Sequence, residues 1–236
     1  MLIRRLLPLL FLAGCAHNPS YEPLDPLEPV NRAVFAFNET ADRYLLRPVA
    51  VGYEAVTPTF VQSGVRNFFG NLFYPVTIFN QFAQGKWSAG VQDLGRLLIN
   101  STLGLGGLVD VAQHWGLPEQ DEDFGQTLGA WGVGEGWYLM LPFLGPSTNR
   151  DLVGRVFDAP LSPLYYSEED ELILGLTAAN LVQVRADLLP ADALLQAQDD
   201  RYAFIRSTYL QQRGAAVRDG APEDNSDFDD LLDELD

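Results

Sequence analysis

The chain has 236 residues, of which 47% are hydrophobic and 11% aromatic, so it can bury a sizeable core in one large domain or two small ones. Its 32 acidic against 15 basic residues give a formal net charge of -17, which argues against nucleic acid as a partner and against electrostatic docking on an anionic membrane. One cysteine and two histidines leave no material for a disulfide framework or a Cys/His zinc site. We therefore expect no metal and no cofactor, and any membrane contact must be hydrophobic.

The N-terminus resembles a bacterial lipoprotein signal. Two arginines precede an apolar run at residues 6–12, and the sequence LAGC ends at Cys15. The resemblance implies that residues 1–14 are removed and that Cys15 carries lipid chains, which anchor a protein stably when two or more act together. An ordinary secretory signal with an incidental cysteine is the alternative. Ala16 beside the anchor matches the sorting preference of outer-membrane lipoproteins in enteric bacteria.

Residues 15–30 are predicted to be a lipidated tether. Their composition is polar and proline-rich, and the prolines repeatedly prevent a helix. Roughly fifteen residues reach at most about 50 Å when extended, so the folded part stays within about one bilayer thickness of the anchor.

Helical periodicity begins after the tether. One helix is expected over residues 31–47, ending before a proline, and Thr57 and Pro58 are predicted to cap and begin a second one. Pro75 is expected to open a third, short helix that Gly85 closes. Because no stretch offers eighteen unbroken apolar residues, we do not expect a membrane-spanning helix.

The most strongly patterned stretch runs over residues 87–102 and predicts an amphipathic helix. Its apolar face has Trp87, Val91, Leu94, Leu98 and Thr102, and the opposite face has Gln92, Asp93 and Arg96.

A glycine elbow follows at Gly104, Gly106 and Gly107, and a second apolar helix of about three turns is expected from Leu108 to Trp115. Glycines among leucines let the backbone approach a neighbouring helix or a ligand closely. A tight helix-to-helix turn and a lipid-contacting turn both remain open. A nucleotide loop is excluded, because the third glycine of a GxGxxG motif is missing and no GK[ST] is present.

Residues 119–123, EQDED, lack the spacing of a calcium loop and predict a solvated, charged loop. The next stretch is rich in glycine, including Gly132, Gly134, Gly136 and Gly145, and residues 137–143 within it could be extended. It has the composition of a loop that moves or packs tightly.

Three helices complete the predicted body of residues 31–213. Ser147 is expected to cap one that stops near Pro160, Ser167 one that reaches residue 189, and the last runs over residues 192–213. Residues 214–236 form an acidic tail, for which a disordered solubilising segment and a helical turn on a partner are the two interpretations.

Five ordered segments carry a resemblance to a known family: DPLEPVNRAVFAFN (25–38), RPVA (47–50), NFFGNL (67–72), RLLINSTLGLGGLVDVA (96–112) and FGQTLGAWGVGEGWYLMLPFLGPSTNRD (124–151). Over residues 25–213 the chain resembles the MlaA/VacJ outer-membrane lipoproteins.

The resemblance implies an all-α, ring-like body whose amphipathic helices lie in the periplasmic leaflet of the outer membrane, beside a trimeric porin. A channel through the ring would let misplaced phospholipids leave the outer leaflet for a periplasmic carrier and an inner-membrane transporter, maintaining lipid asymmetry. Within that frame we expect the glycine elbow to line the channel and the loop of residues 132–145 to adjust its opening. Phe37 and Asn38 would border the rim where lipid is selected.

Two other functions are compared with lipid transport. A lipase is disfavoured because the chain has no GxSxG motif, and the one histidine in the predicted body, His114, stands alone beside Trp115. A structural lipoprotein that scaffolds an envelope complex stays open as the alternative. The direction of net transport would not be encoded in a passive channel, which only equalises chemical potential.

Overall fold

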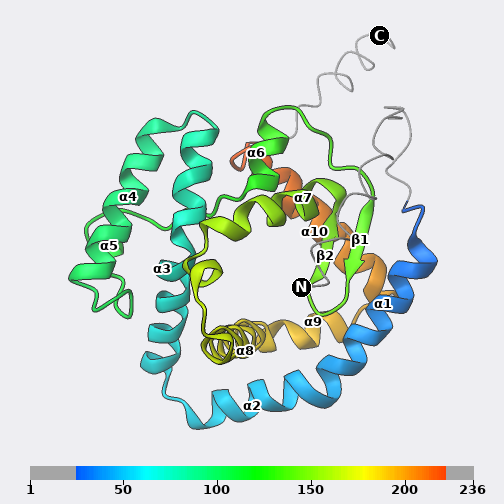
Figure 1. The fold of residues 1–236 in the computed structure, drawn as a ribbon. Helices are drawn as coiled ribbons and strands as arrows, with labels where there is room; N and C mark the ends of the chain where they lie inside the picture. Colours follow the sequence, from blue (N-terminus) through cyan, green and yellow to red (C-terminus); the bar gives the residue numbers. More distant parts are fainter. Residues whose placement is uncertain (1–24, 222–236) are drawn as a thin grey trace, which may run out of the picture.

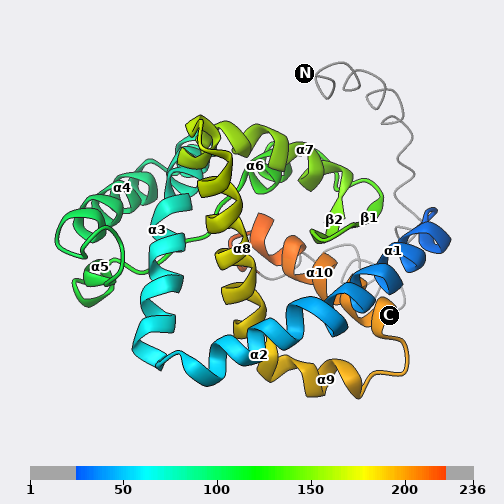
Figure 2. The same cartoon turned by 60° about the horizontal axis from the view of Figure 1, so that its bottom comes forward.

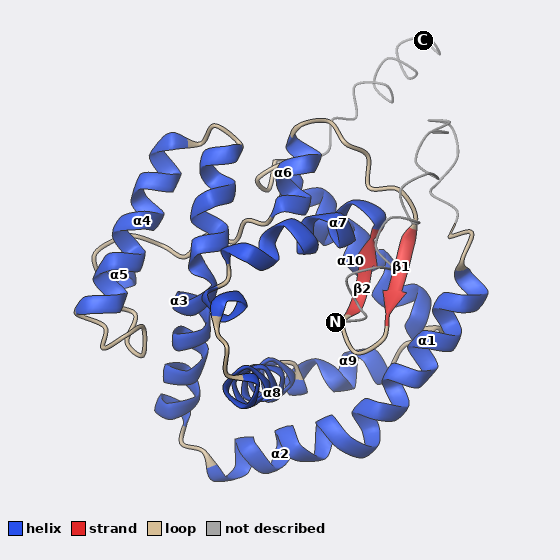
Figure 3. Ribbon diagram, in the orientation of Figure 1, coloured by secondary structure: helices blue, strands red, loops and turns tan. Residues whose placement is uncertain are grey.

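The structure is a computed structural model that describes residues 25–221. The predictions for the signal, for Cys15, for most of the tether and for residues 222–236 of the tail lie outside the described residues. Within the described part, helices follow one another around a ring, with a small hairpin of two strands at one side (Figures 1 and 3). The predicted fold class, an all-helical ring with little strand, is confirmed.

The helices and strands follow in this order: α1 Glu28–Ala41, α2 Arg47–Val56, α3 Thr59–Ala83, α4 Trp87–Thr102, α5 Val111–His114, α6 Phe124–Ala130, β1 Tyr138–Leu141, β2 Gly145–Thr148, α7 Asn149–Asp158, α8 Asp170–Asp187, α9 Asp192–Gln196 and α10 Arg201–Val217. A π-helical turn, Asp42–Leu46, joins α1 to α2, and 3-10 turns lie at Ala159–Leu161, Pro163–Tyr166 and Leu189–Ala191. β1 and β2 are antiparallel, and Tyr138 pairs with Thr148 at one end and Leu141 with Gly145 at the other.

The apolar core is small and lies where α1, the hairpin and α10 meet. Its buried members are Tyr138, Met140 and Tyr202. Partly buried side chains from α1 and α10 pack against them: Val34, Phe35, Ile205, Tyr209 and Leu210. Many other large apolar side chains are exposed, so this fold does not turn its apolar faces only toward itself.

Two predicted breaks at prolines are wrong. The chain stays helical past Pro48. In the π turn before the proline, the Arg47 N–H donates to the Asp42 carbonyl, and a regular α-helix begins again at Arg47. Pro75 lies inside α3 and does not begin a new helix. Around it, Tyr74 and Thr77 are buried, so tertiary packing outweighs the local cost of the proline.

Three predicted helix boundaries also shift. Thr148, not Ser147, caps α7 by accepting a hydrogen bond from the Asp151 N–H, and α8 begins at Asp170. The helix expected over residues 192–213 is two helices, because Asp200 accepts from the Ala203 N–H and starts α10 anew. Thr148 caps α7 one residue after the predicted Ser147, Asp200 caps a new helix within the predicted one, and α8 begins after Glu169, whose side chain forms no capping hydrogen bond.

In the described part of the chain, no single helix is long and apolar enough to span a membrane. The segments Asp170–Asp187 and Leu189–Gln196 reach that length and hydropathy only together, across a bend of 42°.

Candidate functional site

Helix α4 exposes its apolar face and buries its polar one. Trp87 is 69% exposed and Leu98 57%, whereas Asp93 is 2% and Arg96 5% exposed. The helix matches the sequence prediction, and so do its two faces, except that Gln92, predicted beside Asp93 and Arg96, is exposed. The orientation is the reverse of that in a water-soluble protein, where the apolar stripe faces the core. An exposed apolar face of this kind marks a surface for lipid or for another protein.

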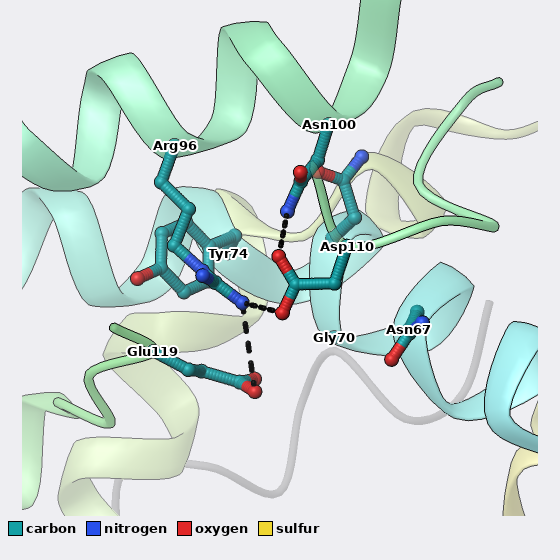
Figure 4. A pocket seen from close by; sticks show the side chains of 8 residues that line it. Asn67, Gly70, Tyr74, Arg96, Asn100, Asp110 and Glu119 are labelled. Atoms are coloured by element: carbon teal, nitrogen blue, oxygen red, sulfur yellow. Dashed lines mark hydrogen bonds and ion pairs between the residues drawn. The ribbon is translucent and has the colours of Figure 1, made fainter. Parts of the chain in front are cut away.

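The polar face of α4 forms a buried cluster with α3 and the segment after the elbow (Figure 4). Arg96 donates from Nη2 to Asp110 Oδ2 and from Nη1 to the Leu117 carbonyl, both at 2.6 Å. Asn100 donates to Asp110 Oδ1 at 3.0 Å and accepts from the Ala112 N–H at 2.9 Å. The cluster therefore ties α4 to residues 110–117, which approach it from the far side of the elbow.

Burial in this cluster disfavours charge on one carboxyl group. Asp93 Oδ1 accepts from the Tyr74 hydroxyl at 2.7 Å, while Asp93 Oδ2 and the nearby buried Gln81 Oε1 have no hydrogen-bond partner. Burial raises the pKa of Asp93 above its usual value. The adjoining pocket, lined by Arg96, Asp110 and other polar residues, has a volume of about 10 Å³, which is room for one water molecule. The cluster is built to hold helices together rather than to receive a ligand.

The glycine elbow is a tight turn on α3. A Cβ atom at Gly104 would overlap the carbonyl oxygens of Val109 and Asn100, and one at Gly107 would overlap the side chain of Asn71. The Asn71 amide donates to the Ser101 hydroxyl at 3.0 Å and so fixes the end of α4 on α3.

The second apolar helix predicted after the elbow is wrong, since α5 is a single turn, Val111–His114. Leu105, Gly106 and Gly107 all have left-handed φ values of 55° to 92°, which end helical progression. A new turn starts only where Asp110 accepts from the Gln113 N–H.

The elbow does not border the centre of the ring. Figures 1 and 2 place α4 and α5 on the outer side of α3, which lies between them and the ring's centre. The prediction that Gly104, Gly106 and Gly107 line a central channel therefore disagrees with the arrangement of the helices. The leucines of the same turn, Leu103, Leu105 and Leu108, are exposed on this outer side.

The acidic run at residues 119–123 is not a wholly solvated loop, in contrast to the prediction. Glu122 is buried and accepts from Lys86 Nζ at 2.8 Å. Asp123 and the buried Asp151 both accept from the Arg213 guanidinium, at 2.6 Å and 2.8 Å. Burial by itself would raise the pKa of Asp123 and of Asp151, but the hydrogen bonds from Arg213 outweigh it, and both values fall below the usual range.

The glycine-rich stretch forms the β-hairpin, and two asparagines of α1 hold it. Asn31 donates to the Tyr138 carbonyl at 3.0 Å and accepts from the Met140 N–H at 2.9 Å. Two helical turns later, Asn38 donates to the Leu141 carbonyl and accepts from the Phe143 N–H, both at 2.9 Å. Each asparagine thus pairs one carbonyl and one N–H of the hairpin backbone, as a neighbouring strand would.

The tip of the hairpin carries an exposed aromatic pair. The rings of Phe37 and Phe143 meet edge to face with centroids 5.1 Å apart, and both are exposed. Of the predicted gating glycines, Gly132, Gly136 and Gly145 have positive φ, while Gly134 does not. The structure therefore brings Phe37 and Asn38 together with this loop, and separates them from the elbow.

Several important residues were not singled out from the sequence. Asn31 and Arg213 are polar positions within helical patterns, and the Tyr138 carbonyl and Asp151 that they bind lie 107 and 62 positions away in the sequence. In residues 25–221, no group of three or more His, Cys, Asp or Glu side chains is arranged to hold a metal ion.

Comparison with known proteins identifies the family. The family model described as MlaA lipoprotein matches residues 23–216. The chain belongs to the MlaA lipoprotein family.

Its similarity to individual members extends over most of the chain. The intermembrane phospholipid transport system lipoprotein MlaA of Escherichia coli is 34% identical over 232 residues, which cover 95% of this chain and 92% of that protein. The protein of the same name from Haemophilus influenzae is 32% identical, over a match that covers 100% of this chain and 98% of that protein. An uncharacterized protein of Rickettsia felis is 38% identical over 87% of this chain and 82% of its own.

A solved structure shares the fold. It was described under "Structural basis for maintenance of bacterial outer membrane lipid asymmetry", and it superposes with a TM-score of 0.74 at 36% identity. The match covers 82% of this chain and 98% of the solved chain.

Proposed function

We propose that this protein is an outer-membrane lipoprotein of intermembrane phospholipid transport, which removes mislocalised phospholipids from the outer leaflet and so maintains lipid asymmetry. Membership of the MlaA family and the names of its relatives support this function. The observation in the structure that carries it is the reversed orientation of α4, with Trp87 and Leu98 exposed and Arg96 buried. Such a helix is stable where its outer face meets hydrocarbon.

A ring of helices suits the transfer of an amphipathic molecule. Burying a phosphate head group in hydrocarbon without partners costs several kcal/mol or more, so the path must offer polar groups beside apolar surface. Side chains that join the helices of this ring supply the polar groups, such as the Arg47–Asp192 pair at 2.8 Å. The ring would act as a passive channel, and the net direction of flow would come from its partners.

The anchor and the partners belong to the same proposal. Cys15 would carry the lipid chains that hold the protein in the periplasmic leaflet of the outer membrane. A trimeric porin would lie beside the ring, and a periplasmic lipid-binding carrier would receive the phospholipid.

We assign the two glycine-rich segments different roles. The hairpin, with Gly132, Gly134, Gly136 and Gly145 around it, is the element that would adjust the opening of the ring, since it is held to α1 by side chains rather than by a continuous sheet. Phe37 and Asn38 would set its position. The elbow at Gly104, Gly106 and Gly107 would act indirectly, by fixing the outer helices α4 and α5 against α3.

The test measures phospholipid exposed in the outer leaflet of cells that lack this chain, with and without a plasmid copy. A rise that the plasmid reverses is the expected result. No change in a strain that expresses the porin and the carrier would overturn the transport function and leave the scaffold as the better description. A matched Cys15→Ala copy should fail to reverse the rise, because a chain without its lipid anchor would not be delivered to the outer membrane.

A further inference from the structure

Helix α8 is uncharged along most of its length and largely exposed. Between Glu171 and Arg185 it has thirteen residues without a charge, LILGLTAANLVQV, whose polar side chains are Thr177, Asn180 and Gln183. Leu174 is 71% exposed, and Leu172 and Leu181 are exposed as well. In the whole helix only Gln183 and Ala186 are buried. Leucines on more than one side of a helix are normally buried, so the first three turns of α8 need a cover that residues 25–221 do not provide.

Side-chain hydrogen bonds within residues 25–221 hold α8 near its C-terminal end. The Tyr53 hydroxyl donates to Gln183 at 2.6 Å, Arg185 Nε donates to Asp42 at 2.7 Å, and Arg66 Nε donates to Asp187 at 2.9 Å. These bonds come from α2, from the π turn and from α3, and all of them reach residues 183–187. They fix the direction of the helix, while the leucines of its first three turns are exposed or half-buried.

The place of α8 distinguishes it from α4. Figure 1 shows α8 end-on, on the inner side of the ring next to α2, and Figure 2 shows it running from the level of α9 to that of α7. It therefore crosses the ring from one face to the other. Its thirteen uncharged residues rise about 20 Å, at 1.5 Å per residue, which exceeds the hydrocarbon depth of one leaflet, about 15 Å.

We propose that residues 172–181 of α8 form an acyl-chain rail, along which the hydrocarbon tails of a phospholipid slide as it crosses the ring. The inference rests on the proposed function and names the part of the chain that holds the tails. Three observations select acyl chains as the occupant: leucines are exposed on more than one side of the helix, its charges are confined to the two ends, and it runs from one face of the ring to the other. A protein partner would instead call for one apolar stripe with a polar rim.

A charge on the rail tests the proposal. A strain lacking the protein receives wild type, Leu174→Asp, Leu174→Met or Leu98→Asp, and the readouts are outer-leaflet phospholipid and the amount of protein in the membrane fraction. Leu98→Asp is the comparison, because Leu98 is an exposed leucine of α4, outside the ring, where a carboxylate would meet the leaflet and not the transfer path; it should reduce clearance less than Leu174→Asp. Since a carboxylate against acyl chains is strongly unfavourable, Leu174→Asp should stay in the membrane and clear phospholipid about tenfold less than wild type. Leu174→Met should clear it normally.

Other outcomes overturn the proposal separately from the function. If wild type clears phospholipid and Leu174→Asp clears it equally well per membrane-bound molecule, the rail is wrong and the function stands. If Leu174→Asp and Leu98→Asp reduce clearance equally per membrane-bound molecule, α8 lies in bulk lipid as α4 does, and the rail is wrong. If wild type clears nothing, the proposed function itself fails.

A second measurement tests the rail even if the Leu174→Asp variant does not accumulate in the membrane. Benzoylphenylalanine at position 174 of the full chain is irradiated in native membranes, and the adduct is identified by mass. A phospholipid adduct is expected at 174 and none at position 211, an exposed glutamine of α10. An adduct to a porin or to a second copy of this chain would overturn the rail.

Discussion

Helices α4 and α10 bury opposite kinds of side chain. Tyr202 of α10 is 2% exposed and packs with Tyr138 and Met140, as in a water-soluble core. In α4, Arg96 is buried and Leu98 is exposed. The ring therefore joins a half with an apolar core, made of α1, the hairpin and α10, to a half that turns apolar side chains outward. A helical period shows which residues share a face, but not which solvent that face meets.

The largest effect should come from removing the buried cation in the inverted half. Arg96→Ala would leave Asp110 charged without its partner and the Leu117 carbonyl unpaired, at a cost of about 3–5 kcal/mol in the free energy of unfolding. Unfolding in detergent, followed by circular dichroism, measures it. Gln92→Ala, an exposed polar position of the same helix, should change stability by less than about 0.5 kcal/mol. Equal effects of the two would show that α4 is not inverted.

Buried carboxylates in the two halves should respond to pH with opposite sign. The pKa of Asp151 is lowered, so its carboxylate contributes stability above its ordinary value of 3.8, and this contribution is lost as pH falls through the folded-state pKa. Asp151→Asn should then cost about 1.5–3 kcal/mol at pH 7 and progressively less below pH 3.8.

Asp93 gives the contrast, because burial raises its pKa and its charged form opposes folding at neutral pH. Asp93→Asn should keep or increase stability at pH 7, and its advantage should vanish as the native carboxyl takes up a proton on acidification. Unfolding curves at pH 7 and near pH 4 measure both variants. A loss of stability in Asp93→Asn as large as in Asp151→Asn would contradict this difference between the halves.

The asparagines of α1 should differ by their burial. Asn31→Ala leaves the Tyr138 carbonyl and the Met140 N–H unpaired in the core and should cost about 1–3 kcal/mol. Asn38→Ala, nearer the surface, should cost about 1 kcal/mol and mainly loosen the hairpin tip. Amide hydrogen exchange at Phe143 would rise in Asn38→Ala and stay low in a Thr40→Ala control, whose hydroxyl bonds only within α1.

The smallest change in stability should come from the exposed face of α4. Leu98→Ser should alter the free energy of unfolding in detergent by less than about 0.5 kcal/mol. Its transfer from water to lipid should weaken by about 1.5–3 kcal/mol, the value of a fully buried leucine, which a vesicle flotation assay of the unlipidated chain would measure. A large loss of stability without a loss of binding would mean that protein covers this face.

Local sequence patterns predicted the elements whose structure depends on residues close together in the chain. The limits of α4 match residues 87–102, and the extended segment at residues 137–143 contains β1. The misplaced helix starts at Thr148 and Asp200 are errors over local caps, and other errors fall where distant groups act. Pro75 stays helical because its neighbours in α3 are buried. Lys86 and Arg213 form ion pairs with the acidic residues Glu122 and Asp123 and hold them against the fold.

The candidate site was predictable only in part. The resemblance to a family pointed to the ring and to Phe37 and Asn38 at its rim, and the composition pointed to the glycine-rich stretch as a loop that moves or packs tightly. The position of the elbow outside the ring and the exposure of Leu174 depend on how helices are arranged in space. No spacing within the sequence contains that information.

The central claim, that α4 turns its apolar face to lipid, is tested most directly by spin labels on the reconstituted protein. A label at Leu98→Cys and one at Gln211→Cys, each with Cys15→Ser, are compared in vesicles for collisions with oxygen, which partitions into lipid, and with a water-soluble nickel complex. The label on α4 should collide with oxygen and be shielded from nickel, and the label on α10 should show the reverse. Nickel access at position 98 equal to that at position 211 would contradict the account.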